Sequence, residues 1–213
     1  MDRHYSPFDH LLINFDQALR TVFGQPLGTD RANPADAAPE AELSARERTA
    51  SARMMRVNHT GEVCAQALYQ GQALTARLET VRDAMARAAQ EENDHLIWCQ
   101  QRVEELGSHT SYLNPLFYVG SFSLGALAGA VGDQWSLGFV AETERQVVEH
   151  LDGHLRRMAS ADRKSRAILE QMKIDEQRHG TAALEAGGTA LPCPVKGLMR
   201  ALSKVMTGTT YWI

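Results

Sequence analysis

The chain has 213 residues, enough for one domain with a substantial core and short appendages. Its net charge of -4 gives no electrostatic footprint for nucleic acid. Its three cysteines are too few and too far apart for a disulfide framework or a zinc ribbon. The first residues lack the apolar stretch of a signal peptide, so we expect a protein that stays in the cytoplasm.

The N-terminal part of the chain differs in composition from the rest. Apolar residues recur at helical spacing over residues 8–23, which predicts a short amphipathic helix. Prolines, glycines and alanines fill residues 24–40, and this composition predicts a linker or a loosely ordered crossing. We therefore divide the chain into an N-terminal segment, 1–43, and a main domain, 44–213.

Two long helices are predicted at the start of the main domain. Ser44 and Glu47 have the spacing of a capping box, and helical periodicity then continues to about Leu78. A second helix is predicted over 80–106, because Gly107 follows it at a position where glycine adopts a left-handed C-cap at low cost.

A Gly-rich apolar segment without any charged residue follows over 110–132. It is long enough to span a membrane, but its glycines, its Pro115 and the lack of flanking basic residues argue against a span. The alternatives are a buried connection of a bundle and a helix lying in the membrane interface. Together with the amphipathic segments at 8–23 and 195–206, it favours a peripheral membrane protein, although each segment alone fits packing on a bundle equally well.

The rest of the sequence predicts three more helices. Two long helices cover 133–159 and 162–186, and a last amphipathic helix includes 195–206. Strand-like alternation of polar and apolar residues does not extend over any length of the chain. The sequence therefore predicts an all-α protein.

Two Glu-x-x-His motifs, Glu92 to His95 and Glu176 to His179, stand out in these helices. On a helix this spacing puts a carboxylate and an imidazole on neighbouring turns of one face. Glu92 follows the apolar stripe of its helix, whereas Glu91 is predicted to point toward the polar side. One such motif is common by chance, but two in a helical chain favour a four-helix bundle that holds two iron or manganese ions.

Such a bundle also needs a single Glu from each of its other two helices, and Glu62 and Glu144 are the candidates. The midpoint between each of them and the Glu-x-x-His motif that follows falls on a predicted turn, near Arg77 for the first and at Ser160 for the second. Each helical hairpin therefore brings a single Glu level with a Glu-x-x-His motif.

The choice of Glu144 depends on the faces of its helix. Glu144 lies on the apolar stripe with Val140 and Val147, whereas Glu142 and Glu149 have mostly polar neighbours and are predicted to be solvated. Four carboxylates and two imidazoles suit iron or manganese better than zinc. The predicted metal ligands are Glu62, Glu92, His95, Glu144, Glu176 and His179.

The sequence leaves two alternative roles open for the other polar residues near the motifs. Asp94 and Asp175 adjoin the motifs and fit either acceptors that orient the imidazoles or ordinary surface salt-bridge partners. His59, His150 and His154 are expected to be groups around the ligands or surface groups rather than ligands themselves.

With these residues in place, the chain resembles the demethoxyubiquinone hydroxylase family of ubiquinone biosynthesis in its bacterial form. The resemblance covers roughly residues 50–213, whereas the family motifs leave 8–40 unexplained. It rests on four stretches, namely Arg56–Glu62, Glu91–Leu96, Ala141–Glu144 with His150, and Asp175–Gly180.

The resemblance implies a ferritin-like four-helix bundle with additional amphipathic and apolar helices, and a di-iron centre. The implied ligands are Glu62, Glu92 and His95 on one iron and Glu144, Glu176 and His179 on the other, with Glu92 and Glu176 bridging. The implied activity is O2-dependent hydroxylation of the ring of a polyprenylated 3-methyl-6-methoxy-1,4-benzoquinol. An external reductant, for which NADH is the candidate, would supply the electrons.

The implied partners are the quinol, the cytoplasmic face of a bacterial cell membrane, other proteins of ubiquinone biosynthesis and a second copy of the chain. Three alternatives stay open from the residues alone. A ferroxidase or iron-storage protein and a quinol oxidase would share the fold, whereas a membrane adaptor would have no enzymatic activity.

Overall fold

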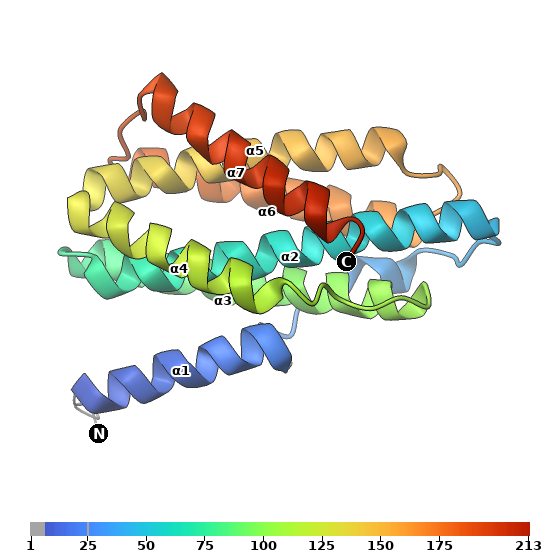
Figure 1. Ribbon diagram of the computed structural model, residues 1–213, viewed down its shortest axis with the longest axis horizontal. Coiled ribbons are helices and arrows are strands. Elements are labelled where there is room, and N and C mark those ends of the chain that lie inside the picture. Colours follow the sequence, from blue (N-terminus) through green and yellow to red (C-terminus); the bar gives the residue numbers. More distant parts are fainter. Residues whose placement is uncertain (1–6, 25) are drawn as a thin grey trace.

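The structure, a computed structural model, describes the backbone of residues 7–24 and 26–213. Side chains are described throughout these ranges except at residues 7, 8, 10, 11, 80, 82–84 and 86, so Phe8 and Leu11 of the first predicted helix lie outside the described side chains. Within the described residues there are seven α-helices, one 3₁₀ turn and no strand (Figure 1). The prediction of an all-α chain is confirmed.

Four long helices run side by side as the bundle (Figure 1), and they are α2 (Ala45–Thr75), α3 (Glu79–Glu105), α5 (Asp133–Arg157) and α6 (Arg163–Glu185). Helices α2 and α3 pack together as one hairpin, and α5 and α6 form the second. The two turns, residues 76–78 and 158–162, lie where the ligand spacing predicted them.

Local sequence signals fix the ends of these helices. The hydroxyl of Ser44 accepts a hydrogen bond from the backbone N–H of Glu47, and the Glu47 carboxylate accepts one in return from the Ser44 backbone N–H. Asp162 caps α6 by accepting from the backbone N–H of Ser165 at 3.2 Å. Gly107, just beyond α3, has a φ of 75°, the left-handed conformation that glycine adopts without steric cost.

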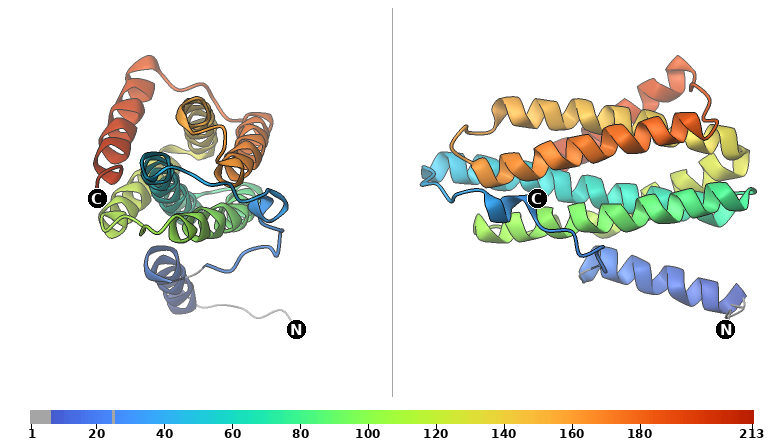
Figure 2. Two further views of the ribbon diagram at one scale, coloured as in Figure 1. Left: turned by 90° about the vertical axis from the view of Figure 1, so that its right-hand side faces the viewer. Right: turned by 180° about the vertical axis from the view of Figure 1, so that it is seen from behind.

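Three further helices surround the bundle, and they are α1 (Pro7–Phe23), α4 (Asn114–Val131) and α7 (Cys193–Thr210). The end-on view in Figure 2 shows α7 and α4 on one side of the bundle and α1 next to α4. The uncharged segment therefore contains a single helix, α4, which begins at Asn114, with Pro115 in its first turn as predicted.

Glycines let α4 approach α2 very closely. A Cβ atom added to Gly125 would lie 2.2 Å from the backbone oxygen of Leu68, and one added to Gly71 would lie 2.2 Å from that of Phe122. Side chains at these positions would push the two helices apart. The glycines that weakened the prediction of a membrane span thus form a helix–helix contact.

Residues 26–38, which we call the strap, connect α1 to the bundle along its outer surface. The strap contains a short 3₁₀ turn, η1 (Pro34–Ala37), capped by the side chain of Asn33, and Ala35 is buried in the core. Hydrogen bonds join it to side chains of α3 and α6, so of the two predicted alternatives the strap fits a linker rather than a loosely ordered crossing. The domain boundary at residue 43 stays a prediction.

Apolar clusters lie on both sides of the polar centre of the bundle. One contains Met55, Ile168 and Met172, and the other contains Tyr69 and Leu137. On α2 the predicted ligand Glu62 lies between Met55 and Tyr69 in sequence. Its carboxylate is therefore enclosed by apolar packing above and below. This placement sets up the buried polar site described next.

Candidate metal centre

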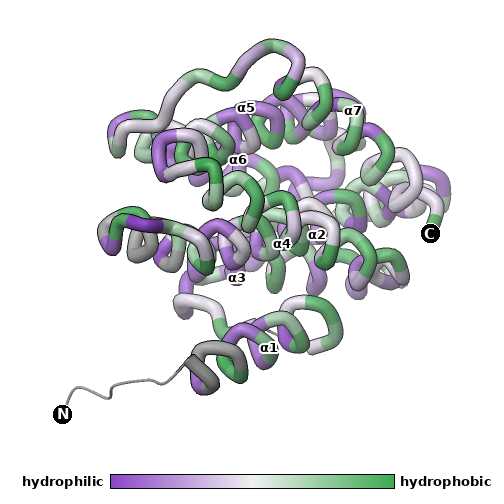
Figure 3. The backbone as a smooth tube through the Cα atoms, turned by 60° about the vertical axis from the view of Figure 1, so that its left-hand side comes forward, coloured by the Kyte–Doolittle hydropathy of each residue, from purple (hydrophilic) through white to green (hydrophobic). Residues whose placement is uncertain are grey.

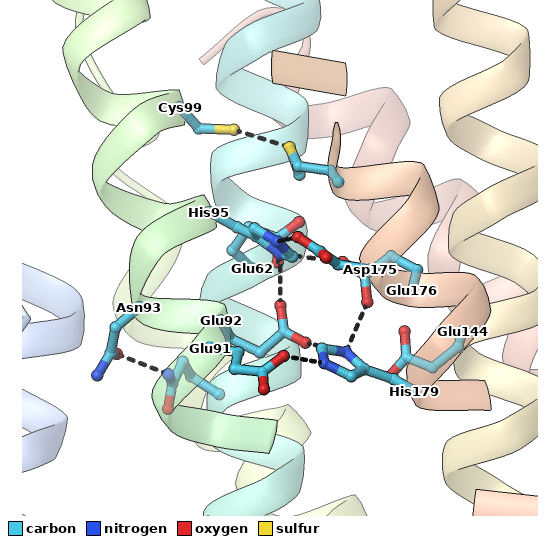
Figure 4. A network of polar contacts seen from close by, with 12 residues as sticks. Glu62, Glu91, Glu92, Asn93, His95, Cys99, Glu144, Asp175, Glu176 and His179 are labelled. Atoms are coloured by element: carbon cyan, nitrogen blue, oxygen red, sulfur yellow. Dashed lines mark hydrogen bonds and ion pairs between the residues drawn. The ribbon is translucent and has the colours of Figure 1, made fainter. Parts of the chain in front are cut away.

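All four bundle helices contribute to one buried polar cluster (Figure 4). Helix α2 supplies Glu62, and α3 and α6 each supply a Glu-x-x-His motif. The ligand atoms of Glu62, Glu92, His95 and Glu176 lie within 4.8 Å of one another, and all four residues are buried.

The two remaining predicted ligands lie at the edge of this group. His179 Nδ1 is 3.1 Å from Glu92 Oε1 and 3.2 Å from Glu176 Oε2. Glu144, from α5, is also buried, and it accepts a hydrogen bond from the hydroxyl of Tyr69. Figure 4 shows its carboxylate beside His179. The structure therefore gathers all six residues, with Glu144 outside the tightest group.

The imidazole of His95 faces more acceptors than it can satisfy. Its Nδ1 lies 3.0 Å from Glu92 Oε2, 3.1 Å from Glu176 Oε1 and 3.8 Å from Glu62 Oε2. One ring proton can serve only one of these oxygens. Oε1 of Glu92 and Oε1 of Glu176 each lie 3.1 Å from a ring nitrogen, but neither contact has the geometry of a hydrogen bond. A bound cation would satisfy these buried oxygens together.

The Nε2 atom of each imidazole, which points away from the cluster, contacts a carboxylate outside the cluster. His95 Nε2 lies 3.0 Å from Asp175 Oδ2, and His179 Nε2 lies 2.8 Å from Glu91 Oε2. An Nε2–H that donates to a carboxylate leaves Nδ1 free to bind a metal. Of the two alternatives for Asp175, the contact with an imidazole is present, and the residue also forms salt bridges with Arg31 and Arg178. Glu91 lies on the more polar side as predicted, since its side chain is 31% exposed and that of Glu92 is 1% exposed, and from there it also reaches His179.

Two other acids differ from their predicted roles. Asp94 orients no imidazole, because it accepts from the backbone N–H of Thr29 in the strap at 2.7 Å. Glu142 is buried rather than solvated, with Arg145 at 2.8 Å and Lys196 of α7 at 3.6 Å. Helix α7 covers this face of α5. The sequence of α5 alone does not show that another helix packs there.

The remaining residues divide between interior and surface. Glu149 is exposed as predicted. His59 and His154 are both buried, so the surface alternative is wrong for them, and His154 Nδ1 lies 2.9 Å from Asn58 Oδ1. His150 borders a cavity described below.

The electrostatics of the cluster favour a cation. Burial raises the pKa of Glu62 and of Glu144 well above the ordinary carboxyl range, and the charges of Glu92 and Glu176 add to this effect. Burial opposes a proton on His95, but the carboxylates around it, Glu92 foremost and then Asp175, Glu176 and Glu62, together outweigh burial and raise the pKa of the imidazole. Metal binding would displace the protons that these raised pKa values imply, and the four ionised carboxylates would then carry four negative charges, which two divalent ions would neutralise. The donor set of oxygen and imidazole nitrogen fits iron or manganese.

An apolar cavity of about 380 Å³ reaches this cluster from the side of α4 and α7. Glu62 forms part of its wall, and apolar lining comes from Leu68 of α2, Leu124 of α4 and Met199 of α7. His150 also lines it, and its buried Nε2 has no hydrogen-bond partner among the described residues. Burial lowers the pKa of His150 to about 4, so this imidazole is neutral at physiological pH.

Comparison with known proteins identifies the family. Residues 49–210 match the family of the ubiquinone biosynthesis protein COQ7. The chain belongs to this family. A 3-demethoxyubiquinol 3-hydroxylase of Nitrosococcus oceani is 65% identical over 211 residues, which cover 99% of each chain. Proteins with the same name from Azotobacter vinelandii and Pseudomonas fluorescens are 60% and 58% identical over 215 and 214 residues. These alignments cover 100% and 99% of this chain and 99% and 98% of the relatives, respectively.

In this member of the COQ7 family, sequence reasoning missed three residues that contact the centre: Tyr69, Glu91 and Arg31. Tyr69 follows Glu62 by two helical turns on the same face, and that spacing could have identified it. Arg31, which pairs with Asp175, comes from the strap, where no helical period predicts which way a side chain points.

Proposed function

We propose that the protein is a di-iron monooxygenase that hydroxylates the ring of a polyprenylated demethoxyubiquinol in ubiquinone biosynthesis. The observation that carries this proposal is that Glu62 belongs both to the buried ligand cluster and to the wall of the apolar cavity. The names of the close relatives supply the reaction. The geometry supports it, because a ring in the cavity would lie next to the metal ligands.

The six clustered side chains, Glu62, Glu92, His95, Glu144, Glu176 and His179, would hold two irons. When bound, the irons supply the redox chemistry that O2 activation requires. His95 and His179 keep Nδ1 toward the cluster because Asp175 and Glu91 hold their far nitrogens. An external reductant, for which NADH is the candidate, provides two electrons, so that one oxygen atom enters the ring and the other leaves as water.

The cavity fits a benzoquinol ring in size and chemistry. Its volume of about 380 Å³ lies within the range of small-molecule pockets, roughly 300–1,000 Å³. Its apolar walls exclude water from the reacting face of the ring. His150 Nε2 lacks a partner among the described residues and is available for a hydrogen bond with a ring oxygen. We propose that this bond orients the ring.

The mouth of the cavity explains how a long prenyl tail is accommodated. Leu116 of α4 and Val205 of α7 line the cavity, yet 67% and 60% of their surfaces are exposed. Hydrophobic residues, coloured green, recur along these two helices and along α1 (Figure 3). We propose that the tail leaves between α4 and α7 into the cytoplasmic leaflet of the membrane, with α1 beside it.

We propose peripheral rather than spanning attachment. Within the described residues one helix, Asn114–Val131, is long and apolar enough to cross a membrane, a judgement from length and composition only. That helix is α4, which packs on the backbone of α2 through Gly71 and Gly125. A span would separate α4 from α2, which carries Glu62, and would dismantle one wall of the cavity.

Single turnover with labelled oxygen tests the proposed reaction. The iron-loaded protein is reduced without air, mixed with a short-tailed demethoxyubiquinol and exposed to ¹⁸O2. We expect about two irons per chain and a hydroxylated product that carries one labelled oxygen atom. Oxidation of iron without a labelled product would favour the ferroxidase alternative. Glu144→Ala should abolish turnover and halve the bound iron, whereas Glu149→Ala on the exposed face of the same helix should change neither.

A further inference from the structure

The strap is bonded to α3 directly beside the first Glu-x-x-His motif. The side chain of Asn93 donates to the backbone oxygen of Leu27 at 2.8 Å, and the backbone N–H of Thr29 donates to Asp94 Oδ1 at 2.7 Å. Gly28 permits this approach, since an added Cβ atom would lie 2.6 Å from the same Asp94 oxygen. Asn93 and Asp94 are the residues between Glu92 and His95, so the strap contacts the motif itself.

From α3 the strap reaches across to α6 through Arg31. Its Nη2 donates to Asp175 Oδ2 at 2.7 Å. The guanidinium carbon also lies 5.1 Å from the centroid of the Trp98 ring, a cation–π distance. Trp98 is buried, and its ring lies 5.4 Å from that of His95. The guanidinium of Arg31 therefore contacts both α3, through Trp98, and α6, through Asp175.

Arg31 and His95 share one carboxylate oxygen. Asp175 Oδ2 accepts from Arg31 and lies 3.0 Å from His95 Nε2, whereas Asp175 Oδ1 takes the weaker contacts, Gln171 at 3.2 Å and Arg178 at 3.3 Å. Arg31 is thus the residue that fixes the position of the oxygen on which the orientation of His95 depends.

We propose that the strap is a positioning element of the metal centre, in which Arg31 fixes Asp175 and Asp175 in turn fixes His95. The inference rests on the metal centre proposed above. A carboxylate held from two sides loses rotational freedom, and a guanidinium supplies the directional donors that such a restraint needs. The strap lies outside residues 49–210, which match the family, and in this proposal it strengthens metal binding.

Metal affinity measures this role without any turnover. Co²⁺ binding to Arg31→Gln is determined by competition with a chelator, and we expect a dissociation constant about tenfold higher than for the wild-type protein. Arg20→Gln is the matched control, because it removes an exposed ion pair with Asp16 within α1. Its affinity should equal that of the wild-type protein. An unchanged affinity in Arg31→Gln would overturn the proposal.

A double-mutant cycle distinguishes a positioning role from general loosening of the structure. If Arg31 acts through Asp175, adding Arg31→Gln to Asp175→Asn should weaken binding no further. Independent losses that add would show that Arg31 acts by another route. Should Arg31→Gln fail to fold, Arg31→Lys replaces it in the same cycle. A wild-type protein that binds no Co²⁺ would refute the metal centre itself, a result distinct from failure of the strap proposal.

Discussion

Replacing Glu62 with glutamine should stabilise the metal-free protein and weaken the metal-loaded one. Glutamine has the same shape but carries no charge. Glu62 is buried, and its ligand atom lies within 4.8 Å of those of Glu92 and Glu176. Without metal these carboxylates repel one another, whereas with metal Glu62 becomes a ligand that glutamine replaces poorly.

The distances give the size of the effect. At an effective dielectric constant of about 20, a pair of ionised carboxylates at 4.8 Å, the upper limit of the separations in the group, costs about 3.5 kcal/mol. Attraction to a protonated His95 at 3.8 Å returns about 4.4 kcal/mol. With two carboxylate neighbours, the net penalty is about 2–3 kcal/mol. The free energy of unfolding of metal-free Glu62→Gln should rise by about that amount.

Urea unfolding of both proteins, stripped of metal and then loaded with iron, measures the two effects. Glu149→Gln, on the exposed face of α5, is the control and should shift the free energy of unfolding by no more than about 0.5 kcal/mol. A metal-free Glu62→Gln protein less stable than wild type would refute the reasoning. The carboxylate would then be a structural group of the fold rather than one kept in place for a cation.

Three further predictions concern the cavity, the α2–α4 contact and pH. His150→Phe should lower kcat/KM for the quinol about tenfold with unchanged iron content, since one hydrogen bond of about 1.4 kcal/mol is lost. Gly125→Ala should lower the free energy of unfolding by about 1–3 kcal/mol, because its Cβ would meet a backbone oxygen at 2.2 Å. Gly120→Ala in the same helix, with open space around its Cβ, should gain up to about 1 kcal/mol in that assay. Burial lowers the pKa of His154 to about 2, and Arg157 adds to the shift, so the unfolded chain binds the proton first. Its contribution is complete above about pH 6.5 and should fall below that by up to about 1.4 kcal/mol per pH unit, and His154→Gln should remove this share of the slope while the shares of His59 and His150 remain.

Each of these predictions can fail on its own. A His150→Phe enzyme with wild-type kcat/KM would show that the ring is oriented by other groups. Equal effects of the alanine variants at Gly125 and Gly120 would mean that α4 is free to move away from α2. An acid unfolding profile of His154→Gln that matches the wild-type profile would place the pH dependence in other groups, namely the carboxylates, His59 and His150.

The bundle and its ligands could be predicted because they depend on local periodicity. Ser44 and Gly107 mark helix ends by chemistry within a few residues, and hairpin symmetry then sets which side chains lie at one level. Two Glu-x-x-His motifs and the midpoints of two helical hairpins together predict the six candidate ligands. The identity of the metal and the ligand roles remain predictions, since they depend on binding rather than on spacing.

The residues that escaped prediction all depend on contacts between distant segments. The sequence of α5 alone predicts that Glu142 faces solvent, yet Lys196 of α7 covers it. Asp94 lies inside one Glu-x-x-His motif and Asp175 directly before the other, and both fit the same two roles from sequence, but Asp94 binds the strap backbone and Asp175 binds an imidazole. Helical spacing places a side chain on a face. It does not say which other segment will cover that face.

The acids that hold the imidazoles cross from one hairpin to the other. Glu91 of α3 supports His179 of α6, while Asp175 of α6 supports His95 of α3. If one hairpin slid along the other by a single helical turn, about 5.4 Å, both bonds would break at once. A bundle assembled out of register would therefore hold every ligand and still bind metal poorly, so metal binding reports on correct assembly of the two halves.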